Sequence, residues 1–160
     1  MAGSIEFSGT LSGKGLRVSV VVSRFNSDIT TRLVAGAEMA LTDLGVVDEN
    51  RAIFWVPGSF ELPLAAKTIA LQGQWDALVC LGAVIKGETA HFDHISTEVS
   101  RGLADVMQQT GIPLGFGVLT TYTLKQAVDR SKGDTTNKGY EATASAIEMA
   151  SLLKQLKEDT

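Results

Sequence analysis

The chain has 160 residues, of which 44% are apolar and 20% are charged, a composition typical of a folded globular domain. Its formal charge of −4 and its lack of a basic run argue against a nucleic-acid partner, because nucleic-acid phosphates are bound by clustered Lys and Arg. The length indicates one domain over residues 1–160. Without a signal-peptide pattern or an apolar stretch long enough to span a membrane, we expect a soluble cytoplasmic protein with no membrane partner.

Residues 1–14 precede the first core strand and hold an apolar patch, Ile5-Glu6-Phe7, among Gly and Ser. This segment is either a loose tail or an N-terminal arm that pairs with the sheet edge of a neighbouring subunit. Four runs that follow are almost continuously apolar, as expected for strands covered on both faces: Leu16–Val22, Ala52–Val56, Ala77–Leu81 and Leu114–Leu119. The lone Cys80 lies within the third run and is predicted to be a small core residue.

Segments with helical periodicity separate the predicted strands. Apolar residues recur at helical spacing over 29–44 and again after His91, and the run 140–156 is rich in Ala and Ser. Thr123 and Gln126 have the spacing of a capping box, which predicts a short helix there. Strands that alternate with helices predict an α/β fold, specifically a flavodoxin-like three-layer αβα sandwich with a four-stranded parallel sheet.

Ligands of such sheets bind beyond the carboxyl ends of the strands, so the residues after each strand are the candidates for a site. Phe25 follows the first predicted strand and Phe60 follows the second. Taken alone, each of these loops could be no more than a helix cap. Two aromatic side chains beside one crevice, however, suggest a platform for a flat ligand.

The third predicted strand leads into the glycine-bracketed loop Gly82–Asp93, where His91 stands at the expected start of a helix. Helix N-termini bind anions, and His is suited to proton transfer near neutral pH. The residues Gly87-Glu88-Thr89 could offer backbone N–H groups and a hydroxyl to a phosphate, with Arg130 and Lys138 as counter-charges. The loop lacks the Gly-Lys-Ser/Thr ending of a Walker loop, which argues against a nucleoside triphosphate.

A metal site is the alternative for this segment, because His91, His94 and Glu98 could share one helix face. The His-Glu-x-x-His pattern is absent and no second cluster offers further ligands. We therefore expect no metal, a structural role for His94 and an acid/base role for His91.

Taken together, several segments resemble the lumazine synthase family, also called the riboflavin synthase beta-chain family. They follow the family's order and spacing across nearly the whole chain: Val21–Asn26, Val56–Pro63, Gly82–Asp93, Phe116–Thr120 and Asn137–Gly139. The resemblance implies a transferase of riboflavin biosynthesis that works without a cofactor. Members of this family join 5-amino-6-(D-ribitylamino)uracil to 3,4-dihydroxy-2-butanone 4-phosphate, forming 6,7-dimethyl-8-ribityllumazine in the penultimate step of the pathway and releasing phosphate and water.

The resemblance also implies roles for single residues. His91 would shuttle protons, and Phe25 would stack on the pyrimidine. The ring and ribityl chain would be held by Ser59, Phe60 and Glu61, helped by the backbone of Ala83, Val84 and Ile85. The phosphate would be gripped by Gly87, Glu88, Thr89 and Arg130, with Lys138 close by. Phe116 and Arg130 would come from an adjacent subunit, since family sites lie at the interfaces of a homopentamer.

The size of the assembly stays open. Family members that form 60-subunit icosahedral shells usually read close to Gly-Thr-Lys-Ala-Gly-Asn where this chain has Lys132-Gly133-Asp134-Thr135-Thr136-Asn137. The N-terminal arm favours a shell, which could enclose riboflavin synthase, whereas the changed loop leaves room for a free pentamer or a pair of pentamers. The alternatives to an enzyme are a flavin or lumazine carrier and a structural shell protein with a dead site.

Overall fold

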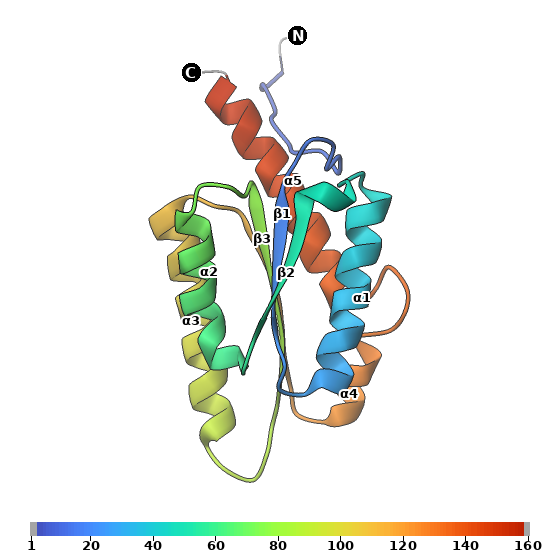
Figure 1. Ribbon diagram of the computed structural model, residues 1–160, viewed down its shortest axis with the longest axis vertical. Coiled ribbons are helices and arrows are strands. Elements are labelled where there is room, and N and C mark those ends of the chain that lie inside the picture. The colour runs from blue at the N-terminus through green and yellow to red at the C-terminus, as the bar shows by residue number, and fades with distance from the viewer. Residues whose placement is uncertain (1–2, 159–160) are drawn as a thin grey trace.

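The computed structural model describes residues 3–158, so the first two residues of the expected N-terminal arm and the last two of the chain lie outside the described residues. Its centre is a parallel sheet of four strands: β1 (Val18–Ser23), β2 (Arg51–Val56), β3 (Ala77–Ile85) and β4 (Leu114–Thr121). The strand order is β2-β1-β3-β4 (Figure 1). The predicted four-stranded parallel sheet is therefore confirmed.

Helices cover both faces of this sheet (Figure 1). One face carries α2 (Leu62–Leu71) and α3 (His91–Thr110), and the other carries α1 (Ser27–Asp43), α4 (Leu124–Asp129) and α5 (Lys138–Glu158). Two 3-10 turns, η1 (Asp48–Asn50) and η2 (Ser59–Glu61), precede β2 and α2 respectively. The molecule is thus the three-layer α/β/α sandwich that the alternation of strands and helices predicted.

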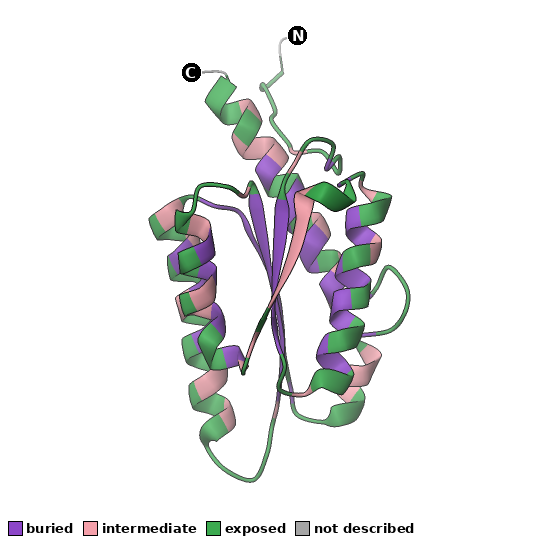
Figure 2. Cartoon of the chain, viewed as in Figure 1, coloured by how far each residue is buried: buried purple, intermediate pink, exposed green. Residues whose placement is uncertain are grey.

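Two apolar cores lie on either side of the sheet, because successive side chains of a strand point to opposite faces. Along β1, Val18, Val20 and Val22 pack against the α1 and α5 face, while Val21 packs against α2 and α3. The central strand β1 is buried along its whole length and β3 at all but its last residue, whereas β2 is mostly half-buried (Figure 2). Cys80 lies in the core beside α2 and α3, where burial raises the pKa of its thiol to about 12, in keeping with the predicted core role.

The segment before β1 forms neither helix nor strand within its described part and runs along α5. Thr10 donates its backbone N–H to Ser151 Oγ at 2.9 Å, and Gln155 Nε2 donates to the carbonyl oxygen of Ser8, also at 2.9 Å. Ile5 and Phe7 remain exposed. In residues 3–158, no helix combines the length and the apolar character needed to cross a membrane.

The third strand is longer than predicted, and this corrects the expected loop Gly82–Asp93. Residues 82–85 belong to β3 and pair in register with β4, from Gly82 opposite Val118 to Ile85 opposite Thr121. The glycine is no strand breaker here, since a Cβ at Gly82 would lie only 2.6 Å from Ser59 Oγ. The connection to α3 therefore comprises only residues 86–90.

Candidate active site

A crevice of about 570 Å³ opens at the carboxyl ends of β1, β2 and β3. The strand order changes direction between β1 and β3, because β1 leads to a helix on one face of the sheet and β3 to a helix on the other. The crevice is mostly apolar and is lined by Phe25, Pro57, Gly58, Ser59, Phe60, Glu61, Ala83, Val84, Ile85, Gly87, Thr89, His91, Phe92 and Ile95.

Two aromatic side chains stand open to solvent in this crevice, as the sequence predicted. Phe25 is 69% exposed and Phe60, on η2, is 59% exposed. The backbone before α1 is tied to the end of β2, since the N–H of Arg24 donates to the carbonyl oxygen of Val56 at 2.8 Å. Exposed aromatic rings on a fixed backbone provide the apolar faces that a planar ligand requires.

The polar groups of the crevice come from the turn after β2. Ser59 is 7% exposed and lies against the β3 backbone at Gly82, while Glu61 is exposed beside it. A hydroxyl can donate and accept hydrogen bonds, and a carboxylate can accept them, so both groups can bind a polyhydroxy chain. Both residues line the crevice where the sequence placed them.

His91 is the first residue of α3 and lies at the edge of the crevice together with Thr89. Its backbone N–H donates to Thr89 Oγ1 at 3.4 Å, and the residue is exposed. An exposed imidazole can take part in proton transfer near neutral pH. The N–H groups at the start of a long helix carry the positive end of the helix dipole and favour an anion.

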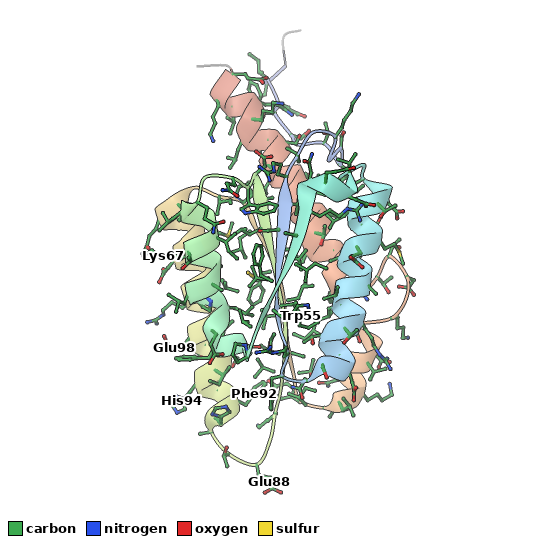
Figure 3. The ribbon with its side chains drawn as sticks, viewed as in Figure 1. Trp55, Lys67, Glu88, Phe92, His94 and Glu98 are labelled. Carbon is green, nitrogen blue, oxygen red and sulfur yellow. The ribbon has the colours of Figure 1, made fainter. Side chains whose placement is uncertain are left out.

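Glu88 is the one residue of the predicted phosphate loop that lies apart from this crevice. It sits at the tip of the loop between β3 and α3 and points away from the body of the protein (Figure 3). Gly87 and Thr89 line the crevice on either side of it. His94 and Glu98 also point outward from α3 (Figure 3), and in residues 3–158 no group of three or more His, Cys, Asp or Glu is placed to hold a metal.

Phe116, Arg130 and Lys138 lie elsewhere, around a smaller pocket of about 200 Å³ on the β4 side of the sheet. Lys138 donates its backbone N–H to the carbonyl oxygen of Arg130 at 2.9 Å, which brings the backbones of the two residues together. Phe116 is 49% exposed although it lies within a strand. The predicted site residues of one chain therefore form two groups on two separate surfaces.

The crevice itself lacks a cation. Among its described lining residues, Glu61 is the one carboxylate and neither Lys nor Arg occurs. An anionic ligand bound there would have only backbone N–H groups and the α3 dipole from its own chain.

Two asparagines received no predicted role, yet each ties parts of this region together. The side chain of Asn26 reaches Ala83, and that of Asn137 links the turn before α5 to α1. Asn before a helix is a weak sequence signal for such a tie, because Asn tolerates the left-handed backbone region. The apolar lining residues Phe92 and Ile95 likewise received no predicted role in the site.

A family model described as 6,7-dimethyl-8-ribityllumazine synthase matches residues 15–154. The matched range contains the four strands, the crevice and the β4 pocket, and it leaves out the N-terminal segment.

Proposed function

Since this chain belongs to the 6,7-dimethyl-8-ribityllumazine synthase family, a family of transferases, we propose that it catalyses the condensation of 5-amino-6-(D-ribitylamino)uracil with 3,4-dihydroxy-2-butanone 4-phosphate. The products are 6,7-dimethyl-8-ribityllumazine, phosphate and water, in the penultimate step of riboflavin biosynthesis. The observation that supports this most directly is the crevice, in which two exposed aromatic rings, a hydroxyl, a carboxylate and a histidine at a helix start lie together.

The pyrimidine stacks on Phe25 in this proposal, with Phe60 closing the apolar surface around it. Ser59 and Glu61 hold the ribityl chain, whose hydroxyl groups need partners of this kind. Peptide groups of Ala83, Val84 and Ile85 at the end of β3 complete the ring site. Edge-on hydrogen bonds to backbone and apolar contacts to both ring faces are the usual means of holding a flat heterocycle.

The phosphate of the second substrate binds to the N–H groups of Gly87, Thr89 and the first turn of α3. Because neither Lys nor Arg lines this crevice among the described residues, the counter-charge comes from Arg130 of a neighbouring copy, with Lys138 nearby. Glu88 contributes backbone to this loop, since its carboxylate points away and would repel a phosphate. Phe116 of the neighbouring copy covers the pyrimidine from the other side.

Two effects accelerate the reaction. Imine formation, phosphate elimination and ring closure need two reactants held in one orientation, and such positioning can supply about 7–11 kcal/mol. His91 moves protons between the reacting groups, which adds a factor of about 10²–10⁴. Positioning is therefore the larger contribution.

The assembly that this site requires is a ring in which each crevice meets the β4 pocket of the next copy. We propose a homopentamer of single-domain chains. Residues 3–14 remain a candidate arm, because Ile5 and Phe7 stay exposed and can cover a neighbour. Sedimentation would distinguish a pentamer from a decamer or a 60-subunit shell.

The test is to incubate the purified protein with both substrates and to follow lumazine fluorescence together with phosphate release. Fluorescent product and phosphate in equal amounts are expected. No product together with tight flavin binding would instead indicate a carrier, and neither product nor binding would indicate a structural shell protein.

A further inference from the structure

Asn26, which follows the crevice residue Phe25 directly, has an unusual backbone conformation. Its φ of 59° and ψ of 47° place it in the left-handed region, and within residues 3–158 it is the one non-glycine residue with a positive φ. Asn adopts this conformation more readily than most residues, but it still costs free energy compared with ordinary backbone. Such positions persist where the surrounding structure requires them, and they cluster at ligand sites.

The side chain of Asn26 spans two elements that otherwise separate. Its Nδ2 donates to the carbonyl oxygen of Ala83 on β3 at 2.8 Å. The pairing of β1 with β3 ends at Val22 and Leu81. Beyond this pair, β1 leads to α1 on one face of the sheet and β3 leads to α3 on the opposite face. The amide of Asn26 thus supplies a link between the two strand ends beyond the last backbone pair.

Backbone hydrogen bonds also fix Asn26 and its neighbour Phe25. Phe25 donates its N–H to the carbonyl oxygen of Pro57 at 3.2 Å, which ties the loop to the end of β2. The carbonyl oxygen of Asn26 accepts from the N–H groups of Ile29 and Thr30, which begins α1. Phe25 is therefore fixed by its own hydrogen bond to the end of β2 and, through its neighbour Asn26, by a hydrogen bond to β3.

We propose that Asn26 is a positioning residue for the pyrimidine substrate. It holds the ring of Phe25 at a fixed distance from the backbone of Ala83 to Ile85, so that a flat heterocycle fits between them without reordering the loop. Asn26 itself does not line the crevice, and it acts through Phe25 and Ala83. The inference rests on the proposed function, since it assigns the space between these groups to the pyrimidine.

Two variants remove the tie in different ways. Asn26→Gly keeps the left-handed backbone at little cost and deletes only the side-chain amide. Asn26→Asp keeps the shape and much of the tolerance for this conformation, but its carboxylate cannot donate to the carbonyl of Ala83. The control is Asn50→Gly, on η1 at the opposite end of the sheet.

The measurements are the Kd of 5-amino-6-(D-ribitylamino)uracil by titration calorimetry and the KM for each substrate. In the variants, binding has to restore the loop order that this hydrogen bond supplies in the wild type, so at most the free energy of one hydrogen bond is lost from binding, a change of about fivefold to tenfold. We expect the Kd and KM for the pyrimidine to rise by that factor in both Asn26 variants. The KM for the phosphate substrate should stay within about twofold, and the control should match the wild type.

Wild-type pyrimidine affinity in both Asn26 variants would overturn the inference and leave the proposed function standing. An equal rise in KM for both substrates would also overturn it, because that pattern indicates general loosening. A wild-type protein that neither binds the pyrimidine nor forms product would overturn the proposed function and this inference with it. If the Asn26→Gly protein fails to assemble, the Asn26→Asp variant alone provides the test of the inference.

Discussion

At the scale of single residues, His91 and His94 form a natural pair for testing acid/base catalysis. His91 lies at the edge of the crevice, whereas His94, three residues further along α3, points outward. Because positioning outweighs proton transfer, we expect His91→Ala to lower kcat by about 10²–10⁴ while product formation stays above the uncatalysed rate. His94→Ala should retain wild-type kcat. Steady-state lumazine fluorescence measures both, and complete inactivity of an assembled His91→Ala protein would contradict the argument.

Gly82 offers a second test at this scale, because its missing side chain leaves space for Ser59. A Cβ at this position would lie 2.6 Å from Ser59 Oγ and 3.4 Å from Leu62 Cδ1. Gly82→Ala should therefore displace the Ser59 hydroxyl and weaken binding of the pyrimidine substrate by about fivefold, with a loss of stability below about 1 kcal/mol. Calorimetric titration and urea unfolding provide the two measurements.

Gly133→Ala is the matched control for this change, since a Cβ there meets no atom within 4 Å and the residue lies in the turn before α5. It should leave the Kd unchanged. Equal Kd values for Gly82→Ala and wild type would show that the hydroxyl of Ser59 does not contribute to binding.

At the scale of elements, Asn137 joins three segments around the start of α5. It is 1% exposed, and its Nδ2 donates to the carbonyl oxygens of Arg32 at 3.0 Å and Lys132 at 2.8 Å. Its Oδ1 accepts the N–H of Gly139 at 2.8 Å. Asn137→Ala would remove these three hydrogen bonds, of which the bond from Gly139 is buried and the other two are part-buried, and we expect a loss of about 1–3 kcal/mol in the free energy of unfolding.

Urea unfolding of Asn137→Ala beside Asn50→Ala measures this loss, and the control should change stability by less than about 0.5 kcal/mol. Asn137 directly precedes Lys138, whose backbone N–H donates to the carbonyl oxygen of Arg130. The hydrogen bonds of the Asn137 side chain therefore also help to fix the backbone of Arg130 and Lys138. A rise in KM for the phosphate substrate should therefore accompany the loss of stability. Unchanged stability would argue that water replaces the side chain in these bonds.

The four strands and the helices α1, α3, α4 and α5 could be predicted from the sequence, because continuous apolar runs, helical periodicity and a capping box are local signals, whereas the short helix α2 was not among the predicted elements. The end of β3 could not be predicted either. Gly82 is normally a signal for a strand end, yet here Ser59 and Leu62 occupy the space beside it and β4 continues the pairing to Ile85. Tertiary contacts from residues twenty or more positions away decide where this strand ends.

The candidate site likewise has residues that could be placed from the sequence and contacts that could not. Phe25, Phe60 and His91 could be placed from the sequence, since the ends of parallel strands meet at one edge of the sheet. The ties made by Asn26 and Asn137 could not, because each side chain bonds to a carbonyl oxygen far away in the sequence. The outward direction of Glu88 depends on the path of the short loop between β3 and α3, which carries no periodic signal.

At the scale of the whole molecule, the two groups of site residues lie on two separate surfaces of one chain. The crevice has aromatic rings and a helix start but no cation among its described lining residues, and the β4 pocket has Phe116, Arg130 and Lys138. Two different surfaces that complete each other make a heterologous contact, which closes into a ring when the rotation between copies allows it. Such a ring has one complete site at each interface.

This arrangement predicts complementation between two defective variants. Arg130→Ala should mainly raise the KM for the phosphate substrate, and the double variant Phe25→Ala, His91→Ala should lack a working crevice. When equal amounts are co-expressed and assemble at random, half of the crevices are intact and half of those face an intact Arg130, so about a quarter of the wild-type activity is expected under conditions where each parent is nearly inactive. Activity equal to the mean of the two parents would show that Arg130 serves the crevice of its own chain. Separate tags on the two variants allow mixed rings to be purified before the assay, so that a failure of assembly is not mistaken for a failure of the shared site.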